Sequence, residues 1–488
     1  MSLQACFSRT PFMSDKNNKT IDDFPLLKEM TPPMRREEAR VEADRCLNCY
    51  DSPCTIACPT HINIPKFIKQ IGSKDNLGSA ITIFDANAMG HSCARVCPVE
   101  ALCEGSCVYL GWHEKPIEIG RLQRFATDAL MEKGIQPFEA GEPNGKTVGI
   151  VGGGPAGLSA AAYLRRLGFA VTVFEKKPMP GGLNTYGMAE YKMDQRVALD
   201  EVALVLDLGV DIRYETVLGD DLKFEDLEKK FDAIFLGVGL GATAPLAIPG
   251  EGLKGVYEAL HFIEYIKNHE FDAIPAGETT VCIGAGNTAI DVVTQAKRIG
   301  TPKVVMSYRR GRADMSAYDY EYELAAGDEI TFEWQTMPIA ILGDDKVTGI
   351  RLQRTELKDG KVLPIEGSEF EIPCDRIVKA IGQTKQVDLL SKTAGITLDK
   401  KGRIVVDATT LQTSNPMVFA GGDAVNGGAE IVNAAAHGKR AALGIFNTLF
   451  PGNPPGPEHS DWIQTIEGVR TVRPPNHHHA KTLETANV

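Results

Sequence analysis

Two stretches of the chain share one order of apolar and polar positions: a short apolar run, a glycine-rich loop, an amphipathic run and a second apolar run. The pattern predicts strands at Thr147–Val151 and Ala170–Glu175 around a helix at Ala156–Leu167, and strands at Thr280–Ile283 and Lys303–Tyr308 around a helix at Asn287–Arg298. Apolar runs of this length that alternate with helical stretches indicate parallel strands. We therefore expect an α/β fold with two separate Rossmann-like units.

The residues before Lys146 follow a different pattern, in which short helical stretches alternate with loops. Helical spacing occurs at Met34–Arg45, Pro65–Ile71, Asn76–Asn87 and Gly120–Lys133. The last stretch has one apolar face, made of Leu122, Phe125, Ala126, Ala129 and Leu130. The pattern predicts an α-helical domain over residues 1–138, of which residues 1–30 form a flexible polar start.

Composition and charge narrow the classes of protein to which the chain can belong. Of its 488 residues, 43% are hydrophobic and 24% are charged, as in globular proteins of several domains. The net charge is −12 and there is no block of Lys or Arg, which argues against nucleic acid as a partner. The sequence has no apolar run of membrane-spanning length and no signal-peptide core, so we expect a cytoplasmic protein without a membrane partner. The Pro-rich residues 451–488 are expected to form a loosely ordered tail.

Cysteines give the first sharp chemical signal. The chain has 11, and those from Cys46 to Cys107 follow the spacings Cys46-x2-Cys49-x4-Cys54-x3-Cys58-Pro and Cys93-x3-Cys97-Pro-x4-Cys103-x3-Cys107. A reducing cytoplasm disfavours disulfides, so clustered thiols indicate metal or iron–sulfur binding. The spacing departs from the bacterial ferredoxin run C-x2-C-x2-C-x3-C-P. Two structural zinc sites with four thiolates each are the alternative to iron–sulfur clusters.

The first glycine-rich loop predicts a dinucleotide-binding site. It reads Gly152-Gly-Gly154-Pro155-Ala156-Gly157 between a strand and a helix. Its glycines permit a tight turn, close approach of a pyrophosphate and close packing of helix on strand, and the helix N-terminus then faces the anion. Glu175 ends the next strand, where a carboxylate bonds ribose hydroxyls. The alternative is a structural glycine turn.

The second glycine-rich loop predicts a nicotinamide site that prefers a 2′-phosphate. It contains Gly284, Gly286, Asn287 and Thr288, and the following strand ends in Arg309 and Arg310 instead of a carboxylate. Arginines bind a 2′-phosphate that a carboxylate would repel, so NADPH is favoured over NADH. The alternative is two solvated surface arginines.

Residues Thr413–Asp423, with the sequence TSNPMVFAGGD, form an apolar run that ends in Gly-Gly-Asp before a helix from about Ile431. This stretch resembles the C-terminal flavin motif of flavoproteins with two dinucleotide-binding domains, in which the Asp meets the ribityl chain of FAD. The resemblance adds Gly182, Leu183, Gly422 and Asp423 to the FAD site. Phe235–Gly241 and Ala380–Gln383, which includes Gly382, resemble the crossovers between the two domains.

The resemblance therefore implies a split FAD domain with an NADPH domain inserted into it. The expected boundaries are residues 143–265 and 388–450 for FAD, and residues 266–387 for NADPH.

Three motifs then carry a family resemblance over about residues 35–450: CLNCYDSPCTIACPTHINIPKFI, CARVCPVEALCEGSCV and PIEIGRLQRFATD. Followed by the flavin motif, they resemble the N-terminal half of dihydropyrimidine dehydrogenase, the separate bacterial subunit that corresponds to that half, and more distantly the small subunit of glutamate synthase.

The resemblance implies two [4Fe–4S] clusters with interleaved ligands. One would be bound by Cys46, Cys49, Cys54 and Cys107, and the other by Cys58, Cys97, Cys103 and the side chain of Gln123. Cys93 would then be unused. The dihydropyrimidine dehydrogenase group has Gln at the position of Gln123, whereas glutamate synthase small subunits typically have Glu. On the residues alone, Gln123 is an ordinary polar residue of a helix.

The implied function is that of an electron-input subunit, in which NADPH reduces FAD and electrons leave through the clusters. The residues after 450 are too few for the FMN-binding β/α barrel, which needs roughly 200 residues. A partner subunit would therefore carry the barrel and reduce uracil or thymine.

The alternatives are a glutamate synthase small subunit, a free-standing NADPH:acceptor reductase and a redox sensor that turns over slowly. No catalytic side chain is expected, because hydride transfer requires only that the two rings be held about 3–3.5 Å apart. His477–His479 are expected to be solvated, and the tyrosines of Asp314–Glu323 to serve packing.

Overall fold

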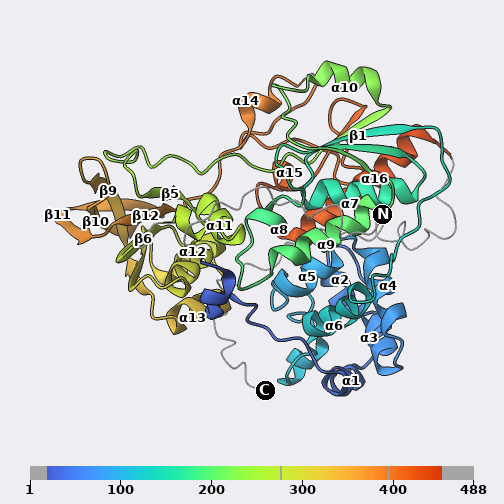
Figure 1. Ribbon diagram of the computed structural model, residues 1–488, viewed down its shortest axis with the longest axis horizontal. Coiled ribbons are helices and arrows are strands. Elements are labelled where there is room, and N and C mark those ends of the chain that lie inside the picture. Colours follow the sequence, from blue (N-terminus) through green and yellow to red (C-terminus); the bar gives the residue numbers. More distant parts are fainter. Residues whose placement is uncertain (1–18, 275–276, 394, 453–488) are drawn as a thin grey trace.

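The protein has a helical part and two parallel sheets, which lie side by side in Figure 1. The computed structural model describes residues 19–274, 277–393 and 395–452. The expected tail beyond Gly452, the histidines at 477–479 and the first 18 residues lie outside the described residues. None of the helices in the described parts is both long and apolar enough to span a membrane.

The helical part, at the lower right of Figure 1, is built from short helices joined by the cysteine-bearing loops. Its helices are α1 (Arg36–Asp44), α2 (Pro53–Ala57), α3 (Ile64–Gly72), α4 (Asn76–Ala86), α5 (Gly90–Val96) and α6 (Ile119–Met131), with a 3₁₀ turn at Val108–Trp112. Asn63 and Asp75 cap α3 and α4 by accepting hydrogen bonds from the backbone of Lys66 and Gly78. Leu122, Ala126 and Leu130 of α6 are fully buried, as their spacing predicts.

The first sheet has the strand order β13-β4-β1-β2-β3, and every pair in it is parallel. Its strands are β1 (Thr147–Val151), β2 (Ala170–Phe174), β3 (Asp211–Arg213), β4 (Ala233–Leu236) and β13 (Val418–Ala420). Its helices are α7 (Pro155–Arg166), α8 (Leu183–Tyr186), α9 (Gln195–Leu206), α10 (Phe224–Lys230), α15 (Asp423–Asn426) and α16 (Ile431–Leu449). Because β13 pairs with β4 across almost two hundred residues, the chain leaves this sheet and returns to it.

The intervening residues form the second sheet, in the order β5-β12-β6-β7-β8. Its strands are β5 (Val256–Glu258), β6 (Thr279–Ile283), β7 (Lys303–Tyr308), β8 (Thr331–Trp334) and β12 (Arg376–Lys379), and its helices are α11 (Ala259–Lys267), α12 (Asn287–Arg298) and α13 (Asp319–Gly327). Helix α14 (Val387–Leu390) follows β12 in the chain and buries Leu390 in the core of the first sheet. A three-stranded antiparallel sheet projects from it at the left of Figure 1, made of β9 (Thr336–Leu342), β10 (Gly349–Lys358) and β11 (Lys361–Pro373). The sequence pattern did not predict this smaller sheet.

Two details differ from the expectations drawn from the pattern. The expected boundary between residues 265 and 266 falls inside α11, and strand β5, which precedes it, belongs to the second sheet because it pairs with β12. The interpretation of residues 19–30 as a flexible start is wrong. Leu27 is fully buried in the core of the second sheet, and Glu29 pairs with Arg95 and Arg124 of the helical part.

Candidate dinucleotide and iron–sulfur sites

The loop between β1 and α7 requires glycine at two of the predicted positions. Gly152 has a φ of 99°, and a Cβ atom on it would lie 2.4 Å from Gly237 O. A Cβ on Gly157 would lie 2.0 Å from Gly152 O. Gly154 is the N-cap of α7, ahead of Pro155, and has extended backbone. The loop therefore brings the N-terminus of a helix to the end of a parallel strand, which is the arrangement that binds a pyrophosphate.

Glu175 lies at this loop, buried to 5% exposure. Its two carboxylate oxygens accept hydrogen bonds from Gly153 N at 2.7 Å and Lys177 N at 2.8 Å. Each oxygen keeps a lone pair for another donor. The carboxylate thus fixes the loop, and its contact with a ribose stays a prediction.

Two further segments, at Gly182 and Gly422, pack against the loop between β1 and α7. Gly182 has a φ of 55°, and a Cβ on it would lie 2.9 Å from Gly154 Cα, while its neighbour Leu183 is 39% exposed. A Cβ on Gly422, whose φ is 69°, would lie 3.1 Å from the Cβ of Ala156. The structure therefore brings together segments that are far apart in the sequence, as the flavin motif requires.

Asp423 follows Gly422 and begins α15. Its Oδ1 accepts a hydrogen bond from Ala429 N at 3.1 Å, and burial raises the pKa of its carboxyl group. Two buried amide atoms nearby in the sequence, Asn184 Oδ1 and Asn426 Nδ2, have no hydrogen-bond partner among the residues described. Buried polar atoms of this kind normally have partners, so the loops have the donors and acceptors that a polar ligand such as FAD would satisfy.

His437 is a residue of this site that the sequence analysis missed. Its Nδ1 accepts a hydrogen bond from Gly422 N at 3.1 Å, and burial lowers the pKa of its imidazole to about 3. The neutral ring thereby holds the turn that carries Asp423. His437 lies on α16, fourteen residues beyond that turn, and no local motif marks it.

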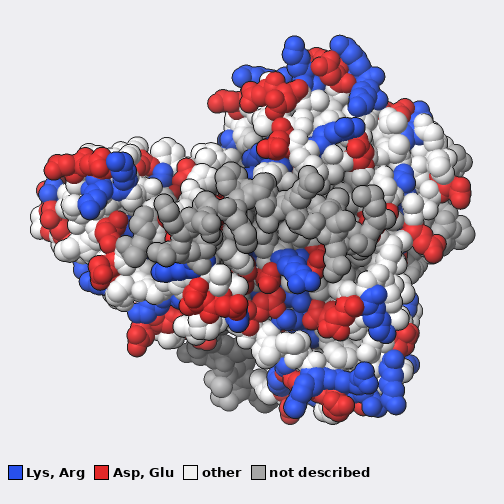
Figure 2. All heavy atoms as spheres, in the orientation of Figure 1, with Lys and Arg blue, Asp and Glu red and all other residues white. Residues whose placement is uncertain are grey.

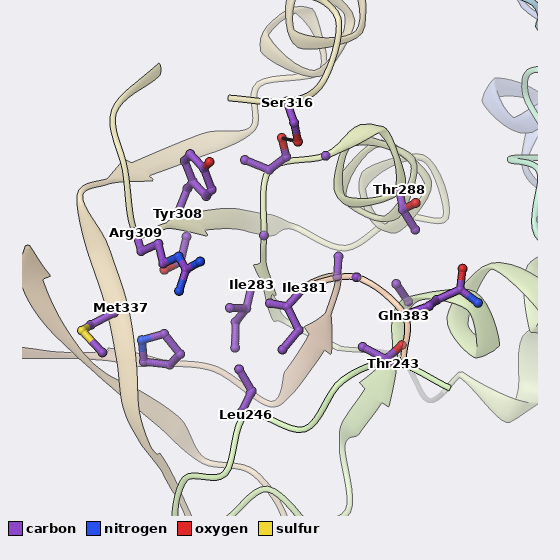
Figure 3. Close-up of a pocket in the computed structure, with 18 of the residues that line it drawn as sticks. Thr243, Leu246, Ile283, Thr288, Tyr308, Arg309, Ser316, Met337, Ile381 and Gln383 are labelled. Atoms are coloured by element: carbon purple, nitrogen blue, oxygen red, sulfur yellow. Dashed lines mark hydrogen bonds between the residues drawn. The ribbon is translucent and has the colours of Figure 1, made fainter. Parts of the chain in front are cut away.

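A cavity of about 600 Å³ lies at the second glycine-rich loop (Figure 3). Of the predicted residues, Gly284, Gly286, Thr288, Arg309 and Gly382 line it. A Cβ on Gly284, whose φ is 131°, would lie 2.2 Å from Ala380 O, so this turn also requires glycine.

In Figure 3, polar side chains lie at the upper left and at the right of this cavity, and apolar ones lie between and below them. Tyr308, Arg309 and Ser316 are polar, as are Thr288 and Gln383 on the right, whereas Leu246, Ile283 and Ile381 form an apolar wall. A cavity with one charged group and an apolar wall can hold a ligand that carries both phosphate and an aromatic ring.

Two predicted residues of this site lie outside the lining. Asn287 Oδ1 accepts a hydrogen bond from Tyr318 N at 3.2 Å, which fixes the loop after β7. Arg310 does not line the cavity, and its Nε is buried without a hydrogen-bond partner within the described ranges. The two arginines therefore differ in position, and only Arg309 has direct access to the cavity.

The predicted cysteines form two groups. Cys46, Cys49, Cys54 and Cys107, the first cysteine group, line one cavity whose walls come only from residues between Cys46 and Ile119. Burial raises the pKa of the Cys54 thiol to about 12 and raises that of Cys46. This set is the one that the family resemblance assigns to a single cluster.

The second cysteine group consists of Cys58, Cys93, Cys97 and Cys103. A hydrogen bond with Cys93, followed by burial, raises the pKa of the Cys97 thiol, while burial followed by the nearby Cys58 raises that of Cys103. Thiols that influence one another in this way lie close enough together to serve as ligands of one cluster.

Gln123 bonds to the helix that carries Cys93 and Cys97. Its Nε2 donates to Gly90 O, the first residue of α5, at 2.7 Å, and the side chain is 7% exposed. Its Oε1 accepts no hydrogen bond from the described part of the chain. The amide is thus held with a free oxygen, while Cys93 also lies among the thiols, so both remain candidates for the fourth ligand.

Within the residues described, no three His, Cys, Asp or Glu side chains converge on one metal ion.

Two dinucleotide-binding sheets joined to a cysteine-rich helical domain define an NAD(P)H-dependent iron–sulfur flavoprotein oxidoreductase. Residues 146–438 match the pyridine nucleotide-disulphide oxidoreductase family, and residues 23–135 match the family described as dihydropyrimidine dehydrogenase domain II, 4Fe-4S cluster. The chain belongs to the pyridine nucleotide-disulphide oxidoreductase family, with this 4Fe-4S domain in front.

Two relatives are about equally similar to the chain. The glutamate synthase [NADPH] small chain of Halomonas elongata is 34% identical over 439 residues, which cover 86% of this chain and 93% of that protein. The NAD-dependent dihydropyrimidine dehydrogenase subunit PreT of Salmonella typhimurium is 33% identical over 423 residues, which cover 87% and 97%.

Among solved structures, Mycobacterium tuberculosis FprA in complex with NADPH has a TM-score of 0.52 and 21% identity, over 66% of this chain and 89% of that one. At that identity the likeness shows the fold alone.

Proposed function

We propose that the chain is the electron-input subunit of a dihydropyrimidine dehydrogenase. It would take electrons from NADPH and deliver them to a separate protein that reduces uracil or thymine. The observation that carries the pyrimidine assignment is the buried Gln123, whose amide is anchored on Gly90 beside the second cysteine group.

The site residues divide into three sets. FAD would be held by Gly152, Gly154, Pro155, Ala156, Gly157, Glu175, Gly182, Leu183, Gly422 and Asp423. NADPH would be held by Gly284, Gly286, Asn287, Thr288, Arg309, Arg310 and Gly382. Two [4Fe–4S] clusters would be held by Cys46, Cys49, Cys54 and Cys107, and by Cys58, Cys97, Cys103 and Gln123. When bound, these groups would supply hydride exchange at the flavin and one-electron transfer at the clusters.

The protein's own side chains would orient the groups. The N-termini of α7 and α12 present backbone N–H groups to the two pyrophosphates. Arg309, which lines the cavity, would supply the charge for a 2′-phosphate. The apolar wall formed by Ile283 and Ile381 would exclude water from a nicotinamide bound in the same cavity.

Polar contacts hold the helical part against the flavin-binding part, next to the second cysteine group. Lys439 Nζ of α16 donates to Thr60 O at 3.3 Å and Ala86 O at 3.2 Å. Glu201 of α9 accepts hydrogen bonds from the backbone of His91 and Ser92, at the start of α5. Such contacts fix the spacing that electron transfer between the two parts would need.

The similarity to glutamate synthase small chains supports a second candidate, in which the partner is the glutamate synthase large chain. The experiment is anaerobic reconstitution of the purified chain with either partner: the FMN-barrel subunit of a bacterial dihydropyrimidine dehydrogenase with uracil, or the large chain with glutamine and 2-oxoglutarate.

We expect NADPH-dependent formation of dihydrouracil with the first partner and no glutamate with the second. The reverse result would refute the pyrimidine assignment. If the chain reduces ferricyanide with NADPH but forms no product with either partner, the remaining interpretation is a free-standing reductase.

A further inference from the structure

The surface around the first cysteine group is unusually apolar for exposed residues. Tyr50, directly after Cys49, is 99% exposed, Trp112 is 61% exposed and Leu47, which lines the cysteine cavity, is 47% exposed. Trp112 packs edge-on against Tyr109, which also lines that cavity, with ring centroids 5.7 Å apart. Leu47 and Tyr109 line the cysteine cavity, Tyr50 follows Cys49 in the chain and Trp112 packs on Tyr109, so all four lie at the first cysteine group. We call this set the Tyr50 surface. Exposed aromatic and aliphatic side chains that gather at one place are typical of binding sites.

The two cysteine groups face different neighbours. The second group adjoins the flavin-binding part, since Thr60 Oγ1 lies 3.3 Å from Cys58 Sγ and the carbonyl group of Thr60 accepts from Lys439. The cavity of the first group has no wall from the flavin-binding or nicotinamide-binding parts. Electrons that enter from the flavin side would therefore leave the molecule by the first group, beneath the Tyr50 surface.

A basic groove continues the Tyr50 surface. The groove has a volume of about 400 Å³ and is lined by Asn48, Pro65, Lys66, Lys69, Gln70 and Ser73. Pro65 lines the cysteine cavity as well, and Asn48 lies between Leu47 and Cys49, so groove and surface are contiguous.

The groove carries positive charge in an acidic protein. Lys66 and Lys69 are exposed, no acidic residue lines the groove, and neither lysine forms an ion pair within the described ranges. The chain as a whole has a net charge of −12. Figure 2 shows Lys and Arg side chains gathered along the lower edge of the molecule, where Figure 1 places α1 and α3. The groove is thus complementary to an acidic surface.

We propose that the Tyr50 surface and its basic groove bind an acidic electron-accepting protein, with the apolar side chains as the contact and Lys66 and Lys69 as the steering charges. This inference rests on the proposed function, because it assumes that electrons leave by the first cysteine group. Charge complementarity raises the rate of encounter, and a central apolar contact then holds the complex for transfer.

The test uses the full, cluster-loaded chain with rubredoxin, a small acidic one-electron acceptor, as the probe. One NADPH reduces two ferric rubredoxins to ferrous rubredoxins and yields NADP⁺ and one proton. We expect Lys66→Glu with Lys69→Glu to lower the second-order rate of rubredoxin reduction about tenfold at low ionic strength, and the difference to shrink as salt is added. Equal rates of rubredoxin reduction by the wild type and the double variant would overturn the proposal.

Three controls separate charge at this surface from general damage. Lys400→Glu with Lys401→Glu reverses the charge of two exposed lysines of the flavin-binding part and should leave the rate of rubredoxin reduction unchanged. Reduction of ferricyanide should be the same in all variants, and reduction of basic cytochrome c should not fall. An equal loss with rubredoxin and cytochrome c would contradict the proposal. Failure of the wild type to reduce ferricyanide would instead refute the proposed function.

Binding without electron transfer gives an independent readout. Zinc-substituted rubredoxin cannot accept an electron, so its Kd, measured by fluorescence anisotropy, reports contact alone. We expect Tyr50→Ala and the Lys66/Lys69 double variant each to weaken binding several-fold or more. Unchanged binding in both would overturn the proposal. A change in the oligomeric state of the double variant, seen by light scattering, would assign the surface to a second copy of this chain and would also overturn it.

Discussion

At the scale of single residues, Gln123 and Cys93 compete for one ligand position. Cys93 is 3% exposed and forms a hydrogen bond with Cys97, while Gln123 donates to Gly90 O and its own oxygen accepts no hydrogen bond from the described residues. An amide oxygen is neutral, so a cluster that uses it carries less negative charge and has a higher potential than one with four thiolates.

The first prediction concerns this pair. Cys93→Ala should keep the full iron content, whereas Gln123→Ala should lose or destabilise one cluster, about four irons per chain. Iron analysis and electron paramagnetic resonance of the reduced protein measure both. Cys282→Ala, which removes a buried thiol of the second sheet, is the matched control. Loss of iron in Cys93→Ala with none in Gln123→Ala would show that Cys93 is the ligand.

The second prediction separates Arg309 from Arg310. Since Arg309 lines the cavity and Arg310 does not, Arg309→Ala should raise the KM for NADPH far more than the KM for NADH, and Arg310→Ala should have the smaller effect. The loss of a charge-assisted phosphate contact costs about 1.5–3 kcal/mol, which lowers the affinity roughly tenfold to 150-fold. Steady-state kinetics with both nucleotides measures the ratio. Equal losses for NADPH and NADH would remove Arg309 from recognition of the 2′-phosphate.

The third prediction is a pH dependence that arises at His437. Its pKa is about 3 in the folded protein and near 6.5 in an unfolded chain, so the unfolded state binds more protons between these values. The stability contributed by the neutral ring is therefore complete above about pH 6.5 and declines as the pH falls toward 3. Urea unfolding between about pH 4 and 8 should show a steeper acid loss for the wild type than for His437→Ala. Parallel curves would contradict this assignment.

At the scale of elements, the contact between α7 and α16 ties the first glycine-rich loop to the Asp423 turn. Ser159 Oγ of α7 donates to Ala435 O of α16 at 2.7 Å. A Cβ on Gly438 would lie 2.3 Å from Ala156 O and 2.6 Å from Ala160 N, so the two helix backbones approach as closely as a glycine allows.

The fourth prediction follows from this close approach. Gly438→Ala should push the helices apart and destabilise the protein by about 1–3 kcal/mol, with weaker retention of FAD because Ala156 belongs to the glycine-rich loop. Gly327→Ala is the matched control, since Gly327 ends α13 with open space around it, and this change should be neutral or slightly stabilising. Urea midpoints and flavin released on gel filtration measure both. An equal effect of the two changes would refute the packing argument.

At the scale of the whole molecule, polar contacts join its three parts. Tyr318 of the nicotinamide-binding part donates to Glu430 Oε1, ahead of α16, at 2.9 Å. Glu29 pairs with Arg95 and Arg124, so the segment before α1 links the helical part to Leu27 in the core of the second sheet. The dinucleotide-binding loops and the cysteine groups nevertheless consist of different residues, so we expect that their cofactors can be removed separately.

The fifth prediction is the composition of the whole protein. Anaerobically purified protein should be brown-yellow and contain about one FAD and about eight irons per chain. Chelation of iron after mild oxidation should bleach the clusters and leave FAD bound, because no cysteine belongs to the glycine-rich loops. Metal analysis and the flavin spectrum test this. Two zinc ions with almost no iron would refute electron transfer through the cysteine groups.

The sequence by itself determined the elements and the class of chemistry. Periodicity predicts the positions of the helices and of the strands around the two glycine-rich loops, because the local spacing of apolar residues differs between helix and strand. The structure has these helices at 36–44, 119–131, 155–166 and 287–298. The spacing of the cysteines and glycines likewise indicated iron–sulfur and dinucleotide sites, since these motifs are contiguous in the chain.

Only the tertiary structure decided which residues meet across long distances. His437 reaches Gly422 through the packing of α16, Leu27 anchors a segment that looks unstructured by composition, and Arg309 but not Arg310 turns into the cavity. The antiparallel sheet β9–β11 also escaped prediction, because its longest strand, β11, is largely exposed and its apolar residues do not alternate regularly with polar ones. Sequence patterns report which face of an element is apolar, whereas the partner of a side chain depends on how the elements pack, and that is a property of the folded chain.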